Sequence, residues 1–377
     1  MTEYKLVREQ EWSQAVSLAD RVFRDDEQKS MAEGFPLVFS PALRQSYGAF
    51  EEGRLVAFIG LVPHLIRIGT AILKTFSIGA VCTDPDERGR GHAGRILELV
   101  QQHAADAGAS LLLVSGARPL YTRAHCYPYG EMHRYGLTPD GVGTVRKLRE
   151  GITVRGMEPT DLYALHDLAR ARRFAFEQSP YEFALLLRAE AYASCTKLAH
   201  RTLLAEENGK LLAFAVMSLP IPGITPQRAP FLVEWAGDPS VAAGLLIHAV
   251  QAYGLEKLEA VAPWHEQEFI EAMDGISYQI EQNYGTIHVL SPDHLLEQLR
   301  PYWQDQGLSD TNFQVRQEAD GTYLLALAGK SHTLTTEEWV SLLFDPVSKA
   351  DLPAEWKKPL AACFPIPFPY VAGLNYV

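Results

Sequence analysis

The sequence predicts a mixed α/β protein made of three consecutive units. Three observations indicate this class: strand-like and helix-like segments alternate, the layout of the first unit is repeated in the second, and 377 residues fit two or three domains at roughly 150 residues each. Hydrophobic residues make up 47% of the chain and charged residues 21%, as in an ordinary globular protein. We place the units at residues 1–149, 150–283 and 284–377.

In the first unit, apolar residues recur at helical spacing over residues 12–23, which predicts a helix there. The expected strands are 4–8, 46–51, 54–67, 70–83 and 111–114. After residue 83, the polar loop TDPDERGRG leads into a helix expected over about 94–106. This order of elements predicts a sheet of mixed strand direction with helices packed on it.

The second unit repeats this layout in a plainer form. The expected elements are strands at 152–155, 202–206, 211–218 and 231–236, and helices at 161–174 and 241–253. Where the first unit has its glycine-rich loop, the second has GDPSVAAG, without the arginine and the dense glycines. We therefore expect an internal duplication in which one copy keeps the chemistry and the other serves as scaffold.

The third unit is expected to be a small α+β unit that ends in an unusual tail. Its expected elements are helices at 292–303 and 336–344 and strands at 312–317 and 323–328. From Pro359 to Val377 no residue is charged, and three prolines alternate with apolar residues. Because chain ends are normally polar and frayed, such a tail predicts an extended segment packed against the protein, with the carboxylate of Val377 held in a fixed place.

Several classes of protein are excluded. No apolar stretch approaches the 18 residues of a spanning helix, and the N-terminal residues lack the apolar core of a secretory signal. Cys82, Cys126, Cys195 and Cys363 lie far apart, which indicates reduced thiols and neither a disulfide framework nor a metal site. We expect a cytoplasmic protein that needs no metal.

The net charge is −12 and no tract is basic, which argues against nucleic acid or an anionic membrane as a partner. An acidic surface attracts polycations, although solubility alone also explains such a charge. Three adjacent acids, Asp25, Asp26 and Glu27, follow the first helix. They are candidates for binding a cationic substrate, and a solvated loop explains them equally well.

The segment from Arg88 to Gly94, RGRGHAG, is the sharpest signal in the chain. It follows a strand and opens a helix, where glycines allow close approach and free N–H groups favour phosphate oxygens. Gly89, Gly91 and Gly94 fit the dinucleotide pattern GxGxxG, but that pattern should leave the first strand of its unit and have an acid about 20 residues on. Here several strands come first and Gly108 lies in the region of that acid. The pattern Arg-x-x-Gly-x-Ala, read from Arg88, fits better.

On this loop, the strand order, the segment Val81-Cys82-Thr83 and a tyrosine after the next strand, residues 1 to about 136 resemble the GCN5-related N-acetyltransferases, the GNAT superfamily. The resemblance implies that the loop amides hold the pyrophosphate of coenzyme A, and that the preceding strand offers backbone groups to the pantetheine arm and the acetyl carbonyl. It implies an acetyl-CoA site formed by Val81, Cys82, Thr83, Arg88, Gly89, Arg90, Gly91, His92, Ala93 and Gly94.

The whole chain resembles the Eis (enhanced intracellular survival) group of this superfamily, with tandem GNAT domains, the second degenerate, and a C-terminal domain similar to sterol carrier protein. The resemblance implies N-acetylation of a primary amine such as an aminoglycoside or polyamine, in a homo-oligomer. It also implies Tyr121 as general acid and the carboxylate of Val377 as general base. A phenol with a pKa near ~10 can protonate a thiolate whose conjugate acid has a pKa near ~8.5.

The segment after Tyr121 departs from the family pattern, because His125 and Cys126 replace a glycine and an aromatic residue. Tyr127 is therefore a rival for the acid role, and His125 is a further candidate for taking part in the reaction. The departure also keeps open a different class of function, an acyl-CoA or lipid-binding sensor with a vestigial transferase site. A nicotinamide oxidoreductase is the weaker third alternative, because it rests on the GxGxxG match alone.

Overall fold

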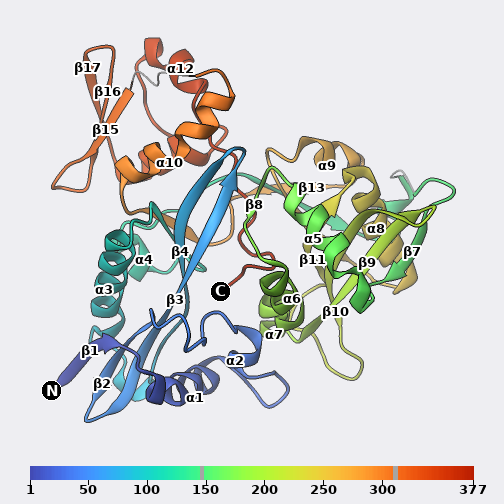
Figure 1. The fold of residues 1–377 in the computed structure, drawn as a ribbon, viewed down its shortest axis with the longest axis horizontal. Helices are drawn as coiled ribbons and strands as arrows, with labels where there is room; N and C mark the ends of the chain where they lie inside the picture. The colour runs from blue at the N-terminus through green and yellow to red at the C-terminus, as the bar shows by residue number, and fades with distance from the viewer. Residues whose placement is uncertain (145–147, 309–312) are drawn as a thin grey trace.

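The computed structural model describes residues 1–144, 148–308 and 313–377 (Figure 1). Over these residues the chain forms two seven-stranded sheets and one three-stranded sheet. We call the first two sheet A and sheet B, and together with their helices the first lobe and the second lobe. The predicted mixed α/β class is confirmed.

Sheet A has the order β1-β2-β3-β4-β5-β14, with β8 added beside β3. Its strands are β1 (Thr2–Leu6), β2 (Tyr47–Glu51), β3 (Arg54–Ile68), β4 (Ala71–Thr83), β5 (Leu111–Val114), β8 (Phe174–Phe176) and β14 (Thr286–Val289). All neighbours are antiparallel except β4 and β5, which are parallel. The three long predicted strands are confirmed to within a residue or two, because their apolar runs are bounded by turns with a glycine at positive φ.

The helices of the first lobe are α1 (Trp12–Phe23), α2 (Met31–Gly34), α3 (His92–Asp106) and α4 (Pro119–Arg123). Leu18 of α1 and Ile96 of α3 belong to buried clusters on opposite faces of sheet A. Both helices were predicted, α1 from its apolar spacing and α3 from the polar loop before it, and α1 has the predicted bounds. Helix α3 starts two residues earlier than expected, directly after Gly91.

Sheet B has the order β13-β6-β12-β11-β10-β9-β7. Its strands are β6 (Met132–Leu137), β7 (Thr153–Gly156), β9 (Leu198–Glu207), β10 (Lys210–Pro220), β11 (Phe231–Gly237), β12 (Leu258–Pro263) and β13 (Tyr278–Glu281). Its helices are α5 (Leu162–Ala171), α6 (Pro180–Ala189), α7 (Ala191–Cys195), α8 (Pro239–Ala252) and α9 (Gln267–Ala272). Here too the neighbours are antiparallel except one pair, β11 and β12. From β1 to β5 and from β7 to β12, the two sheets thus repeat one pattern of directions, with α3 and α8 in equivalent positions.

The two lobes exchange strands. Strand β6 precedes residue 149 in the chain yet pairs with β12 of sheet B, and β14 follows residue 283 yet pairs with β5 of sheet A. Strand β8, whose first residue was the last of the helix predicted over 161–174, pairs with the far end of β3. That helix ends at Ala171 because the next residue, Arg172, is extended (φ −64°, ψ 135°). Three segments therefore cross between the lobes, whatever domain boundary is drawn along the chain.

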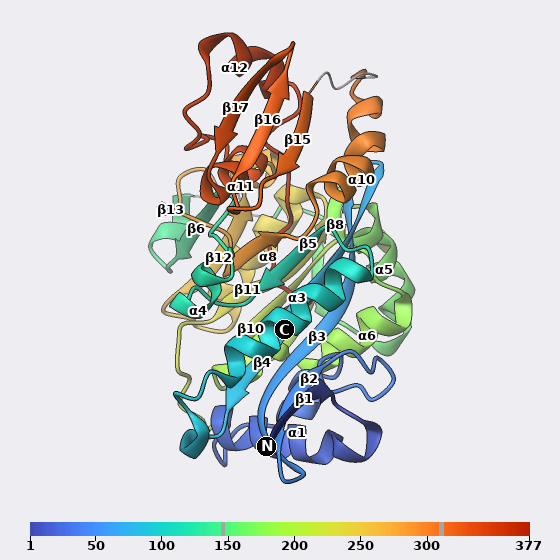
Figure 2. The ribbon, with the colours of Figure 1, turned by 90° about the vertical axis from the view of Figure 1, so that its left-hand side faces the viewer.

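The C-terminal unit lies at one end of the molecule and its tail returns to the centre (Figures 1 and 2). Its described elements are α10 (Pro292–Asp305), β15 (Phe313–Gln317), β16 (Tyr323–Leu327), β17 (Lys330–Leu334), α11 (Thr336–Phe344) and α12 (Ala354–Ala361). The expected strand at 312–317 begins at a residue outside the described part of the chain. Beyond α12 the tail has neither helix nor strand, and Phe364, Ile366, Phe368, Leu374 and Val377 are buried. The predicted packing of the tail is confirmed, but the tail is not extended throughout, because the N–H of Tyr376 turns back to the carbonyl of Gly373 (3.2 Å). Its end lies between the two lobes in Figure 1.

Two isolated side chains outside the first lobe's site are structural. Trp235 is 5% exposed and stacks on Phe269 with ring centroids 4.4 Å apart. His288 is buried, and its Nδ1 is 3.1 Å from the carbonyl oxygen of His125. In the described residues, no helix combines the length and the apolar character needed to cross a membrane.

Candidate active site

The parallel pair β4 and β5 opens into a wedge. The two strands pair from Thr75 with Leu111 to Ile78 with Val114, after which β4 continues to Thr83 without β5. At this point β4 carries a bulge, because Gly79 pairs with Gly60 and Cys82 with Phe58, so that two residues of β4 oppose one of β3. Ala80, in the bulge, has a φ of +51°. A bulge turns backbone groups away from the ladder, and here it does so at the mouth of the wedge.

The first turn of α3 is open to an anion. Its N-cap is Gly91, at a φ of +81°, and no side chain caps the helix. The first backbone hydrogen bond of the helix runs from Arg95 N–H to the carbonyl of Gly91 (3.1 Å), which leaves the N–H groups of His92, Ala93 and Gly94 for another acceptor. A Cβ added at Gly89 or Gly91 would have nothing within 4 Å. This arrangement suits a phosphate group.

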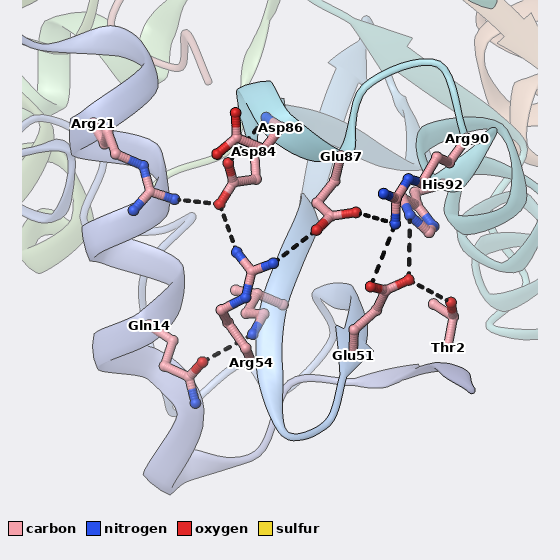
Figure 3. Close-up of polar contacts among 11 residues, drawn as sticks. Thr2, Gln14, Arg21, Glu51, Arg54, Asp84, Asp86, Glu87, Arg90 and His92 are labelled. Carbon is pink, nitrogen blue, oxygen red and sulfur yellow. Dashed lines mark hydrogen bonds and ion pairs between the residues drawn. The ribbon is translucent and has the colours of Figure 1, made fainter.

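Buried ion pairs hold the loop before α3 in place (Figure 3). Asp84 accepts hydrogen bonds from Arg21 (2.8 Å) and Arg54 (2.9 Å). Arg54 also donates to Glu87 (2.7 Å), whose other oxygen lies 2.5 Å from Arg90. The side chain of Arg90 therefore points back to β2 and β3 rather than along the helix. Among the predicted coenzyme residues, Arg90 contributes its backbone, while its guanidinium anchors the loop.

The other predicted coenzyme residues differ in exposure. Val81 and Thr83 are half-buried on β4, and Arg88 is exposed and enters no ion pair with a described residue. Cys82 points into the core beneath α1, and burial raises the pKa of its thiol to about 12. Its sulfur is therefore protonated at neutral pH, and only its backbone is available to a ligand.

Val377 lies directly against the bulge. A Cβ added at Gly79 would be 2.6 Å from the carboxyl carbon of Val377 and 3.3 Å from Val38. Glycine at position 79 is what allows this approach. Val377 and Tyr376 also line a small cleft at the wedge, which is completed by Ser77, Leu113, Val114, Ser115, Phe176, Tyr284, Val371 and Asn375. The tail that was predicted to hold Val377 in a fixed place thus brings it to the strand before the glycine loop.

Polar side chains from the second lobe and from β13–β14 fasten the tail. Asn283 donates to the carbonyl of Pro369 (2.9 Å) and accepts from the N–H of Val371 (3.3 Å). Gln178 donates to the side chain of Asn375 (2.5 Å), two residues before Val377. Three tyrosines, Tyr192, Tyr284 and Tyr376, surround this end with ring centroids 4.7 to 5.7 Å apart. The sequence analysis missed all of these residues, because their only shared feature is their position around the tail.

Tyr121 lies across the sheet from Val377. It is 6% exposed and belongs to the cluster on the α3 face, whereas Val377 belongs to the cluster on the α1 face. Its ring lies against Gly116, just beyond the end of β5, where an added Cβ would be 3.2 Å away. Burial raises the pKa of its phenol, so the group is protonated at neutral pH. The two predicted catalytic residues therefore flank the end of β5 from opposite faces.

The rival residues near Tyr121 have other contacts. Tyr127 forms a backbone bridge with Ile287 of β14, and its ring packs against the core shared with the C-terminal unit. His125 has a φ of +58°, which explains why the family pattern has glycine there. Its carbonyl is 3.1 Å from the ring of His288, and its ring contacts Gly321 of the C-terminal unit.

The acidic loop after α1 forms ion pairs with a lysine of the second lobe. Lys197 lies 2.7 Å from Asp25 and 2.5 Å from Glu27, and its ammonium lowers the pKa of Asp25. Asp26 is exposed. Two of the three predicted substrate-binding acids thus already have a cationic partner within the chain.

Comparison with known proteins agrees with this geometry. Residues 3–129 match the family model of the acetyltransferase (GNAT) domain. No curated protein matches the sequence.

Three solved structures share the fold over 89% of this chain and 85% of their own. A probable N-acyltransferase from Enterococcus faecalis is 14% identical with a TM-score of 0.62. A GCN5-related N-acetyltransferase from Anabaena variabilis is 12% identical with a TM-score of 0.59. Eis1 from Mycobacterium abscessus is 11% identical with a TM-score of 0.56.

The chain therefore carries a GNAT acetyltransferase domain in its first lobe, and it is an enzyme of the GNAT type. Acyltransferases of this fold use acetyl-CoA or another acyl-CoA. The predicted enzyme class is confirmed.

Proposed function

We propose that this protein is an acetyl-CoA-dependent N-acetyltransferase that acts on a primary amine of a small cationic molecule, such as a polyamine or an aminoglycoside. The observation that carries the proposal is the position of Val377. Its carboxyl carbon packs against Gly79 at the β4 bulge, next to the loop that opens α3. A carboxylate at the mouth of the wedge can attract an ammonium group and accept its proton.

The coenzyme lies across the wedge in this proposal. The amides of Gly89 through Gly94 at the uncapped start of α3 bind the pyrophosphate, and Arg88 is exposed nearby for a further phosphate contact. Backbone groups of Val81, Cys82 and Thr83 bind the pantetheine arm, and the bulge at Ala80 directs an N–H toward the acetyl carbonyl. Hydrogen bonds to that oxygen stabilise the negative charge that develops on it.

The transfer then follows in one direct sequence. The carboxylate of Val377 takes a proton from the substrate ammonium, and the amine nitrogen attacks the thioester carbonyl. The new C–N bond forms, the C–S bond breaks, and the phenol of Tyr121 gives its proton to the departing thiolate. The raised pKa of Tyr121 supports the acid role, because the group must carry its proton at neutral pH.

The acceptor is assigned by charge. The chain has a net charge of −12, and the wedge opens beside the aromatic rings of Tyr284 and Tyr376, which favour a cation. Asp25 and Glu27 contribute only if their ion pairs with Lys197 open, whereas Asp26 is already exposed. We expect no nucleic acid or membrane as partner, and no metal in the transfer step.

In the proposal, the second lobe and the C-terminal unit have supporting roles. Sheet B repeats the strand directions of sheet A, which supports a second, degenerate GNAT domain. The C-terminal unit is then the counterpart of a sterol-carrier-like domain, and its function is to deliver the tail. By resemblance to the Eis group we also expect a homo-oligomer.

The test is release of free thiol from acetyl-CoA with aminoglycosides, polyamines and peptides as acceptors. We expect activity with the cationic small molecules, and a loss of at least about 100-fold in kcat for Tyr121→Phe. The matched variant Tyr127→Phe should stay within a few-fold of the native chain. One glycine added after Val377 should abolish transfer while acetyl-CoA still binds.

Each part of the proposal has its own contrary result. Full activity after the glycine addition would remove Val377 from the mechanism and keep the transferase. A larger loss for Tyr127→Phe than for Tyr121→Phe would exchange the two tyrosines. Binding of acetyl-CoA with no transfer to any acceptor would favour the sensor.

A further inference from the structure

Three side chains converge beside the start of α3, on the side away from the wedge. They are Glu51 at the end of β2, Glu87 in the turn Pro85–Glu87, and His92 at the first position of α3 (Figure 3). One donor atom from each lies within 4.8 Å of the others. The side chain of His92 is 4% exposed, that of Glu87 is 9% exposed and that of Glu51 is 27% exposed. No part of the transfer mechanism uses these three side chains.

The buried imidazole of His92 is the independent sign of a missing ligand. Its Nε2 has no hydrogen-bond partner among the described residues, and it points toward Glu51, whose Oε1 is 4.0 Å away. Its Nδ1 is 3.0 Å from the hydroxyl of Tyr4. When Nδ1–H donates to Tyr4, the lone pair of Nε2 faces two carboxylates. A buried lone pair next to two negative charges is unfavourable unless a cation lies between them.

Each of the three candidate ligands also contacts a side chain that lies outside the cluster. Tyr4 fixes the ring of His92, Thr2 donates to Glu51 Oε1 (2.9 Å), and Arg54 donates to Glu87 Oε1 (2.7 Å). Outer partners of this kind orient metal ligands and set the tautomer of a ligating histidine. The arrangement is therefore more than a group of acids on a surface.

A cation already lies at this point, namely the guanidinium of Arg90. Its Nη1 is 2.5 Å from Glu87 Oε2 and 3.6 Å from Glu51 Oε2. The side chain of Arg90 is 55% exposed and is flanked by Gly89 and Gly91, both at positive φ in open space. It can leave without a change in the core, whereas Glu87 and His92 beneath it are buried.

From these contacts we infer that Glu51, Glu87 and His92 form a divalent metal site for which Arg90 competes. One imidazole nitrogen with two carboxylates suits Zn²⁺ or Co²⁺ rather than Ca²⁺ or Mg²⁺, which prefer oxygen ligands alone. Bonds of about 2.1 Å in a tetrahedral site place the donor atoms about 3.4 Å apart. The three donors, which lie within 4.8 Å of one another, therefore need to close by up to about 1.4 Å. The fourth position, on the exposed side of Arg90, is left for water.

The site is tested by titrating Zn²⁺ into the full chain, freed of metal with a chelator, in a calorimeter without coenzyme. We expect one Zn²⁺ per chain, and Glu51→Gln should weaken binding by at least about tenfold. The exposed neighbour provides the matched control, because Glu52→Gln should leave the affinity unchanged. Tyr4→Phe, which removes the outer partner of His92, should weaken binding by about tenfold.

Arg90→Met provides the sharpest test because the expected change has the opposite sign. Removing the competing guanidinium should tighten Zn²⁺ binding, and this side chain is exposed enough to be replaced without unfolding. Absorption by bound Co²⁺ in the visible range gives a second readout, and it should be lost in Glu51→Gln. Absence of Zn²⁺ binding at millimolar concentration, equal binding by Glu51→Gln and Glu52→Gln, or no gain in Arg90→Met would each overturn the proposal. The measurement involves no acetyl transfer, so it fails independently of the proposed function.

Discussion

Helices α3 and α8 follow equivalent strands of the two lobes, yet their first turns are built in opposite ways. Helix α3 begins at Gly91, which offers no side chain to the first N–H groups. Helix α8 begins at Asp238, whose carboxylate accepts from the N–H of Val241 (3.0 Å), and Pro239 removes another donor. The first turn of α3 therefore leaves its N–H groups open to an acceptor, whereas the first turn of α8 is capped within the chain.

The wedges beside these two helices also differ in what they contain. In the first lobe the wedge between β4 and β5 contains a cleft and the end of the tail. In the second lobe, β11 and β12 pair only at Phe231 with Glu259, and the region beyond holds Arg172. Arg172 pairs with Glu234 and Glu266 and lies 5.2 Å from the ring centroid of Trp235. The same layout of strands thus holds the end of the chain in the wedge of the first lobe and a cluster of charges in that of the second, where Arg172 and Trp235 line larger cavities.

The C-terminal tail runs from the second lobe to the wedge of the first lobe. A Cβ added at Gly373 would lie 3.0 Å from the carbonyl of Val233 in β11, while Val377, four residues on, contacts Gly79 in β4. The second lobe therefore contacts the segment of the tail that ends at the wedge of the first lobe.

The largest expected effect tests whether the second wedge is a structural core. Arg172→Met leaves Glu234 and Glu266 without their buried partner, so we expect a loss of about 3–5 kcal/mol in the free energy of unfolding. Urea denaturation measures this loss. The triple variant Arg172→Met, Glu234→Gln, Glu266→Gln should recover most of it. If the triple variant is as unstable as the single one, charge is not what holds this wedge together.

The second prediction concerns a variant in which the first turn of α3 is made similar to that of α8. Gly91→Asp places a carboxylate at the start of α3 and a side chain at a φ of +81°, so acetyl-CoA affinity should fall by more than about 100-fold. Its counterpart Asp238→Ala should leave acetyl-CoA affinity unchanged and reduce stability by about 1 kcal/mol through loss of the N-cap. Equilibrium binding of acetyl-CoA and thermal unfolding measure the two effects. Equal acetyl-CoA affinity in both variants would contradict the contrast between the helices.

The third prediction concerns the approach of the tail to β4. Gly79→Ala forces Val377 to move, because the new Cβ would be 2.6 Å from its carboxyl carbon. A displacement of this size should lower kcat by about 100-fold while acetyl-CoA binding is retained. Gly156→Ala on β7, where a Cβ meets nothing within 4 Å, is the matched control and should be neutral. An unchanged kcat in Gly79→Ala would show that the position of Val377 does not matter for transfer.

The last prediction concerns the pH dependence of stability contributed by a buried histidine of the first lobe. Burial lowers the pKa of His64 in the first lobe to about 4, so the unfolded chain binds a proton that the folded chain excludes between about 6.5 and 4. The stability of the native chain is thus full above pH 6.5 and falls below it, by about 1.4 kcal/mol per pH unit for each such histidine. His64→Phe, which keeps an aromatic ring beside Phe176, should reduce that slope by the share of one histidine. Urea denaturation at several pH values gives the slope, and an unchanged slope would mean that His64 is protonated in the folded chain.

Much of the first lobe could be predicted because its signals are local. The runs that became β3 and β4 are bounded by turns, and the loop from Arg88 to Gly94 carries its chemistry in consecutive residues. The short strands β6, β8 and β14 were missed, because each owes its pairing to a partner more than 100 residues away in β12, β3 or β5. Their sequences are too short for periodicity to identify them.

By itself, the sequence determined the mixed α/β class, the glycine loop at a helix start, the loss of that loop in the second copy, and a charge-free tail that must be packed. Only the tertiary structure decided where the tail goes, that Arg90 anchors the loop through Glu87, and that His92 faces Glu51 and Glu87. The physical reason is the distance along the chain over which each kind of interaction acts. Turn, cap and strand preferences act over a few residues. The contacts and charge state of a buried carboxylate, imidazole or chain end depend instead on neighbours that only the folded chain brings within a few ångströms.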